Sequence, residues 1–213
     1  MTENLEEIST REVILEKAKQ LFLVQSYHKT TMRSLAEAAG ISTGPLYFHF
    51  KNKAEVFFHV CNQGFDYLIA DFHAAAEKSE HAAIRLRSIY YAYKTFYYQE
   101  PQLFELMHLA IDPMAGIDLP AQLSQTLHRK AWEKVLIMEQ VIKEGILRKE
   151  LRPIEPQQLA LYLYSVAEGI FLSKRTGVLE QSTVNLDEMI EAAIDVIGLG
   201  MVSCIQERLG DEI

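Results

Sequence analysis

Apolar residues recur at the helical spacing along nearly the whole chain of 213 residues, and no convincing alternating pattern of a strand appears. Helices with such a pattern bury their apolar faces against one another. The sequence therefore predicts an all-α fold. The length fits one domain of ordinary size or two small ones.

Helix start signals divide the chain into short helices followed by longer ones. The stretch "STRE" at 9–12 forms a capping box, Thr30 is a candidate cap for a short helix that Gly40 ends, and Asn52 pairs with Glu55 at the start of a longer helix. After about residue 78 the helices lengthen, and prolines lie near three of the starts. We expect these later helices over 80–98, 101–111, 119–147, 156–174 and 186–208.

The charge is unevenly distributed. The net charge is −8, but residues 8–53 hold seven Lys or Arg against three Asp or Glu, whereas residues 54–213 hold 14 against 23. A basic segment on an acidic chain indicates a nucleic-acid-binding head, although a few charges also fall unevenly by chance.

Two short predicted helices are joined by only Gly40 and Ile41. This is the arrangement of a helix-turn-helix, whose second helix presents its N-terminal half to the major groove of DNA. We therefore predict a three-helix DNA-binding head over residues 1–53 and a separate helical body over residues 54–213.

The second helix, predicted over 42–48, has residues that suit this role. Gly44 removes a side chain where the backbone would approach DNA closely. Pro45 lies in the first turn, where its missing N–H has no intrahelical partner to lose. Leu46 and Phe50 are four residues apart and are expected to face inward.

Polar groups around this helix are candidates for contacts with the duplex. Tyr47 and His49 carry donors for phosphates, and Lys53 adds a positive charge at the start of the next helix. Arg33, in the first turn of the preceding helix, can reach a guanine edge or a phosphate. The alternative is that Tyr47 and Phe48 only fill a small core and that the lysines are solvated surface charges.

The segment "TTMRSLAEAAGISTGPLYFHFKNKAEVF" resembles the DNA-binding segment of the tetracycline-repressor (TetR) family of bacterial transcription regulators. The chain departs from the family pattern at Ser26, where glycine is usual, and at Pro45, where Thr, Ser or Ala is commoner. The resemblance covers residues 9–57 and rests on Thr31, Leu35, Ala36, Ala39, Gly40, Ile41, Ser42, Gly44, Leu46, Tyr47, His49, Phe50 and Lys53.

The resemblance implies roles for residues of the head. Arg33 would read a base or hold a phosphate. The residues in or over the major groove would be Ser42, Thr43, Gly44, Pro45 and Tyr47. The residues holding the phosphate backbone would be Thr31, His49 and Lys53.

The body is rich in aromatic side chains, above all in "SIYYAYKTFYYQEP" at 88–101. Members of the resembled family enclose a small effector in this part of the fold, and an aromatic cavity with polar tips would suit a planar or lipophilic ligand. The alternative is that these side chains only fill a core. The candidate ligand-binding residues are Tyr90, Tyr93, Tyr97, Phe104, Met107, His108, Trp132 and Tyr162.

The last two predicted helices carry apolar stripes, and Gly198 and Gly200 would allow helices to approach closely. The resemblance implies that these helices pair with those of a second copy, and a dimer reads a palindromic operator with two heads about 34–36 Å apart. The alternative is that both stripes pack within one chain. The candidate interface residues are Leu159, Leu163, Val166, Ile170, Ile190, Ile197 and Met201.

The rival class is a helical-bundle metal-binding protein or enzyme. The motif Glu105-x-x-His108 and the pairs Glu55/His59 and Glu77/His81 have metal-ligand spacing, but a di-iron bundle needs a second Glu-x-x-His and two further glutamates.

No signature of a common enzyme class occurs, so we expect a cytoplasmic regulator without cofactor or metal rather than an enzyme. Its expected partners are double-stranded DNA, a small effector and a second copy of the chain, and no membrane. Cys61 and Cys204 fit no metal or redox pattern and are expected to be buried.

Overall fold

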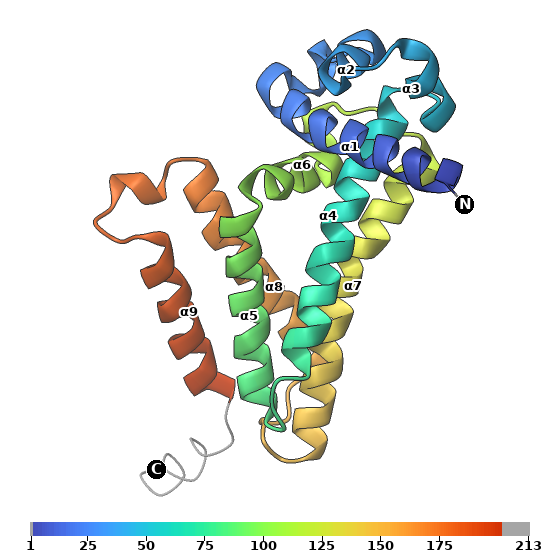
Figure 1. Ribbon diagram of the computed structural model, residues 1–213. Coiled ribbons are helices and arrows are strands. Elements are labelled where there is room, and N and C mark those ends of the chain that lie inside the picture. Colours follow the sequence, from blue (N-terminus) through green and yellow to red (C-terminus); the bar gives the residue numbers. More distant parts are fainter. Residues whose placement is uncertain (1, 202–213) are drawn as a thin grey trace, which may run out of the picture. The chain divides into compact units, whose positions relative to one another are not determined.

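The computed structural model describes the backbone of residues 2–201 and the side chains of residues 10–201, and every regular element in this range is helical (Figure 1). The all-α prediction is confirmed. The α-helices are α1 (Thr2–Lys29), α2 (Met32–Ala39), α3 (Thr43–His49), α4 (Lys53–Ala76), α5 (Ala82–Gln99), α6 (Pro101–Ile111), α7 (Ala121–Leu147), α8 (Pro156–Arg175) and α9 (Leu186–Met201). Short 3-10 turns lie at η1 (Pro113–Ala115) and η2 (Leu179–Gln181).

The chain divides into two compact units. The first contains residues up to Ile69 together with Thr95–Ala131, and the second contains Ala70–Lys94 and the chain from Trp132 onward. The division falls inside three continuous helices, α4, α5 and α7. The helices of the predicted head therefore belong to a unit that extends beyond residue 53.

Most predicted helix bounds match the observed ones to within two residues, but the predicted start of the first helix is wrong. Helix α1 begins at Thr2 rather than at Ser9, because Leu5, Glu6 and Glu7 before Ser9 are good helix formers. Helices α5 and α7 begin at Ala82 and Ala121, each two residues after the predicted start. The predicted end of the last helix at residue 208 and Cys204 lie outside the described residues.

The predicted cap at Thr30 is also wrong, since Thr31 caps α2. Thr31 Oγ1 accepts a hydrogen bond from the Ser34 N–H at 3.0 Å, and Ser34 Oγ accepts one from the Thr31 N–H at 2.9 Å. Thr30 is instead buried, and its hydroxyl donates to the Ser26 carbonyl oxygen at 2.8 Å. The two threonines together fix the turn between α1 and α2.

Ser26 interrupts α1 with a backbone conformation that favours glycine, at φ 67° and ψ 159°. Such a conformation costs about 1–3 kcal/mol for a residue with a side chain. We expect Ser26→Gly to raise the free energy of unfolding by about 1 kcal/mol, because relief of strain exceeds the extra chain entropy of glycine. Urea unfolding measures the change. Ser26→Ala retains the strain and should show no comparable gain, and an equal gain in both variants would contradict this account.

The first unit is built around aromatic and aliphatic side chains of α1, α3, α4 and α6. The rings of Phe22 and Phe57 meet edge to face at 5.1 Å, and Leu46 and Phe50 are buried as expected. A Cβ added at Gly64 would lie 2.5 Å from the Met107 sulfur, so α4 and α6 pack too closely for a larger residue there. Cys61, also on α4, is buried in agreement with the prediction.

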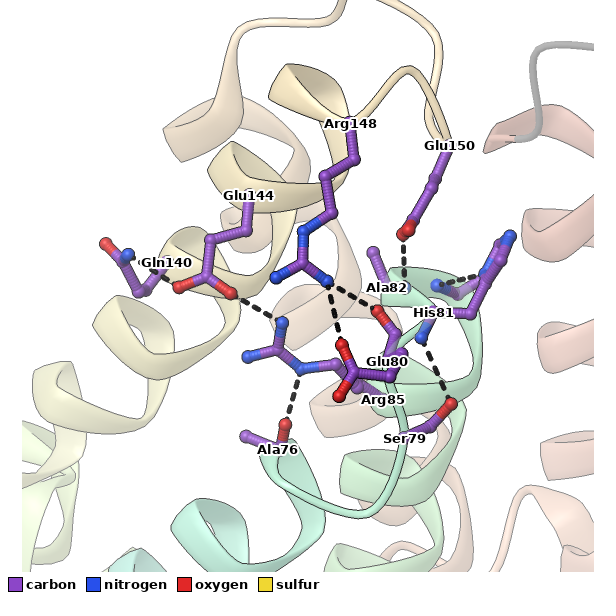
Figure 2. Close-up of polar contacts among 11 residues, drawn as sticks. Ala76, Ser79, Glu80, His81, Ala82, Arg85, Gln140, Glu144, Arg148 and Glu150 are labelled. Carbon is purple, nitrogen blue, oxygen red and sulfur yellow. Dashed lines mark hydrogen bonds and ion pairs between the residues drawn. The ribbon is translucent and has the colours of Figure 1, made fainter.

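In the second unit, polar contacts tie the start of α5 to α4 and α7 (Figure 2). Arg85 donates to the Ala76 carbonyl oxygen and to the Glu144 carboxylate, the latter at 2.5 Å. The carboxylate of Glu150 accepts a hydrogen bond from the Ala82 N–H at 2.7 Å, which satisfies a donor at the start of α5. These contacts hold the start of α5, the helix that carries the candidate ligand-binding residues Tyr90, Tyr93 and Tyr97.

Candidate functional site

A tight turn sets helix α3 against α2 in the first unit. Gly40 ends α2 with φ 70°, and its N–H together with that of Ile41 bonds back to the carbonyl of Ala36. Helix α3 then starts at Thr43 with Ser42 as its N-cap residue. The structure thus has the short helix–turn–helix expected of a DNA-reading head.

Helix α3 separates its residues into a buried and an exposed side. Leu46 and Phe50 lie in the core, whereas Tyr47 is 55% exposed and Phe48 is 73% exposed. The alternative in which Tyr47 and Phe48 fill the core is therefore wrong. Ser42, Thr43, Gly44 and Pro45 are also exposed, and His49 is half-buried.

Packing within the protein does not require a glycine at position 44. A Cβ built at this position would have no heavy atom within 4 Å beyond its own helix and neighbours, and the backbone is not in the left-handed region. Glycine in a helix normally costs stability relative to alanine. Gly44 therefore stays a candidate for close contact with another molecule.

The three remaining predicted DNA contacts already have partners within the protein. Arg33 Nε donates to Glu37 Oε1 at 2.9 Å in an exposed ion pair. Lys53 Nζ donates to the Tyr27 carbonyl oxygen at 2.7 Å, and burial lowers its pKa. The hydroxyl of Thr31 lies within the cap of α2. An exposed ion pair is weak and exchanges easily, so Glu37 does not fix the Arg33 side chain, whereas Lys53 holds the end of α1.

His59 on α4 lies against the core side of this head. Its ring centroid is 5.6 Å from that of Phe50, and burial, together with the positive charge of Arg11, lowers its pKa, partly offset by Glu55. The folded state therefore favours the neutral imidazole. The His59 imidazole binds a proton more readily in the unfolded chain, so the free energy of unfolding should decrease as the pH drops below about 6.5.

We expect His59→Gln to reduce this loss of stability at acid pH. Urea unfolding midpoints of both proteins at pH 7.5 and pH 5.5 measure the effect. An equal decrease in the two proteins would show that other groups cause it.

The eight candidate ligand-binding residues are divided equally between the two units. In the first unit, Phe104 and Met107 are buried, and the Phe104 ring contacts those of Tyr97 at 5.1 Å and His108 at 4.2 Å. The His108 ring also hydrogen-bonds the Phe104 carbonyl through Nδ1 at 2.8 Å. This packing matches the alternative in which these aromatic side chains fill a core.

In the second unit, Trp132 and Tyr162 are exposed, while Tyr90 and Tyr93 are buried. The Tyr90 hydroxyl donates to the Leu163 carbonyl oxygen at 3.1 Å. The Tyr93 hydroxyl donates to Glu168 Oε1 at 2.5 Å. Burial raises the pKa of both tyrosines, so both hydroxyls remain protonated donors at neutral pH.

A cavity of about 440 Å³ lies in the second unit between α5, α7, α8 and α9. Tyr90 is the one candidate ligand-binding residue that lines it. The helical pattern could not reveal this cavity, because its walls combine buried and exposed residues from four helices. The lining comprises Ala83, Ile84, Leu86, Arg87, Tyr90, Met138, Leu163, Ile194, Asp195, Ile197, Gly198, Leu199 and Met201.

A buried polar cluster in the same unit was missed by the sequence analysis. Lys134 is only 2% exposed, and its Nζ lies 3.8 Å from Glu168 Oε1 and about 5 Å from the ring centroids of Tyr93 and Tyr164. Burial lowers the pKa of Lys134, and the charge of Glu168 opposes this shift. A signal did exist, because Lys134 occupies an inward position of α7, in register with Met138 and Val141.

The candidate interface residues lie mainly inside the protomer. Their side chains are buried except that of Val166, which is half-buried, so they are not on the surface where an interface residue must lie. The opposite faces of α8 and α9 are exposed and apolar instead. On these outward faces lie Leu161, Tyr162, Gly169, Leu172, Ala192, Val196 and Gly200.

Between residues 10 and 201, no group of three or more His, Cys, Asp or Glu side chains could hold a metal ion. Likewise, none of the helices between residues 2 and 201 is both long and apolar enough to cross a membrane.

Comparison with known proteins agrees with this geometry. The sequence profile of the bacterial regulatory proteins of the tetR family matches residues 14–60, which span the helix-turn-helix. The HTH-type transcriptional repressor KstR2 of Mycobacterium tuberculosis is 29% identical over 148 residues, which cover 67% of this chain and 72% of KstR2.

Solved structures show the same fold. The TetR family transcriptional regulator PfmR from Thermus thermophilus superposes with a TM-score of 0.71 at 21% identity, over 86% of this chain and 96% of PfmR. AibR, solved in complex with isovaleryl coenzyme A and operator DNA, superposes with a TM-score of 0.68 at 17% identity, over 88% of this chain and 97% of AibR. The protein thus carries the DNA-binding segment of the tetR family of bacterial regulatory proteins at residues 14–60, and it shares the fold of solved TetR family transcriptional regulators.

Proposed function

We propose that this regulator is a repressor that binds a palindromic operator as a homodimer in the cytoplasm and is released from it by a small lipophilic effector. The observation that carries the DNA-binding part is the exposed side of α3, where Gly44 leaves open space beside Tyr47. A helix with an open position beside an exposed aromatic residue can approach the floor of a major groove closely. Neither Gly44 nor Tyr47 is buried in the core of its own unit.

The remaining head residues complete the proposed DNA surface. Arg33 would exchange its contact with Glu37 for one with a base edge or a phosphate. His49 and Thr31 would lie beside the phosphate backbone of the DNA. Lys53 would contribute a further donor while it holds the Tyr27 carbonyl, because an ammonium group has three N–H donors.

The outward faces of α8 and α9 support the proposed dimer. Apolar residues such as Leu172 and Val196 are exposed there, and monomeric proteins rarely leave such a face uncovered. A Cβ at Gly169 or Gly200 would have no heavy atom within 4 Å, so a helix of a second copy can approach closely at both positions.

The cavity in the second unit supports a response to a small molecule, since its volume lies within the range of ligand pockets. AibR has been solved with both a coenzyme A thioester and operator DNA, which is the kind of dual binding proposed for this chain. The proposed mechanism is a population shift in which effector and operator favour different arrangements, so each weakens the binding of the other by the same factor.

Selection of double-stranded DNA from a random pool tests the proposal. We expect a palindromic consensus, an affinity that decreases with salt, and a complex that contains two protomers. Retention of every sequence with equal affinity, or a complex with a single protomer at saturation, would contradict the proposal.

A further inference from the structure

We propose that the cavity between α5, α7, α8 and α9 binds a neutral, mainly saturated lipophile whose single polar end is a hydroxyl or a similar group that both donates and accepts hydrogen bonds. This inference rests on the proposed ligand response and specifies its ligand. It differs from the sequence-based expectation of an aromatic pocket.

The inner part of the cavity is apolar and aliphatic. Leu86, Met138, Leu163 and Met201 are buried and line it. Tyr90 supplies the one aromatic ring among the described lining residues, and its hydroxyl is bonded to the Leu163 carbonyl rather than pointing free into the space. Methionine and leucine side chains adjust to irregular aliphatic shapes. A planar aromatic ligand would find few rings to stack on.

A charged group would be unfavourable deep in this space. The charged side chains that line the cavity are Arg87 and Asp195, and both are exposed. Burying a ligand charge against the aliphatic wall would cost its hydration without compensation. The buried part of the ligand is therefore uncharged.

The exposed part of the wall identifies the polar end. The guanidinium of Arg87 is held by the Tyr91 hydroxyl at 3.0 Å and experiences the negative charges of Glu191 and Asp195. An anionic end of the ligand would be attracted by Arg87 but repelled by the two carboxylates. A cationic end would be attracted by the carboxylates but repelled by Arg87. A hydroxyl can accept a hydrogen bond from Arg87 and donate one to Asp195, so it uses both groups.

Gly198 offers a way to fill the cavity without disturbing the fold. It lines the cavity, and a Cβ at this position would have no heavy atom within 4 Å. Gly198→Leu should therefore occupy ligand space. Gly198→Ala is its matched control, because it brings the same gain in helix propensity with only one methyl group.

The experiment measures binding of 1-octanol, 1-decanol and 1-dodecanol, and of decanoate and decylammonium, by calorimetry and thermal shift without DNA. We expect affinity to rise about fourfold per methylene until the cavity is full, and 1-decanol to bind tighter than either ion. Gly198→Leu should weaken 1-decanol at least tenfold, and Gly198→Ala by less than threefold.

Several results would overturn the assignment. These are equal binding of 1-decanol to all three proteins, tighter binding of either ion, and no binding up to the solubility limit. A Gly198→Leu protein whose dimer dissociates in sedimentation equilibrium, with unchanged alcohol binding, would show that the space belongs to a protein interface. Operator binding is measured separately. A protein that binds 1-decanol but no DNA would support the proposed ligand site and contradict the proposed function.

Discussion

Replacing Gly44 with alanine is expected to weaken operator binding at least tenfold while the free energy of unfolding stays unchanged or rises by up to about 1 kcal/mol. The added methyl group enters open space on the protein side, so nothing in the fold opposes it. It would collide with DNA if the α3 backbone lies close to the base edges. A tenfold loss corresponds to about 1.4 kcal/mol, which a mobility-shift titration resolves easily.

The combination of the two measurements is informative. Loss of DNA binding usually accompanies loss of stability, but here we expect the two quantities to move independently. The matched control is Gly198→Ala, the same change at another open helical position, and it should leave operator affinity unchanged without ligand. Wild-type affinity in Gly44→Ala would show that the backbone of α3 stays away from the duplex.

The second large effect is expected from Val196→Glu on the outward face of α9. Val196 is 71% exposed in the protomer, so a glutamate there is hydrated and harmless to a single chain. In a dimer interface the same carboxylate would be buried without a partner, which costs several kcal/mol. We expect sedimentation equilibrium to show monomers at micromolar concentration. Operator affinity should fall at least 100-fold, because a single head reads only half of the site.

Leu147→Glu is a suitable control for this change. Leu147 is a similarly exposed aliphatic residue at the end of α7 and lies outside the proposed interface. The Leu147→Glu protein should remain dimeric and bind the operator with wild-type affinity. If both variants remain dimeric, the outward face of α9 is not the interface, and if both dissociate, the added charge acts non-specifically.

The helices could be predicted from the sequence because their signals are local. Asn52 accepts a hydrogen bond from the Glu55 N–H at 2.9 Å as its position in a capping pair suggested, and the bounds of α6 agree with the prediction. The displaced starts have local causes too. Thr30 and Thr31 are equivalent as caps in the sequence, and only the turn at Ser26 decides between them.

The faces of the helices were harder to assign. An apolar stripe such as Leu159–Leu163–Ile170 shows that a helix is covered on one side, but it does not say whether the same chain or another copy covers it. In α8 and α9 the more apolar stripe is buried in the protomer, and the exposed face mixes Val196 with glycine and alanine.

Buried polar groups and cavities depend on distant segments. The sequence analysis assigned no position to Lys134, which is buried and covered by Tyr93 and Tyr164 of two other helices. Among the aromatic residues, the pattern could not separate Tyr90, which lines the cavity, from Phe104, which packs in a core. Only the arrangement of helices distinguishes them.

The contact between Arg33 and Glu37 has a consequence for the ionic atmosphere of the complex. A cation that binds a DNA phosphate releases condensed counterions, and the number released sets how steeply affinity decreases with salt. In the proposed complex, Arg33 would leave the carboxylate of Glu37, which would then take up a mobile cation. The net release of ions would therefore be smaller than the number of basic groups in the head implies, and removal of the Glu37 charge would make the salt dependence steeper.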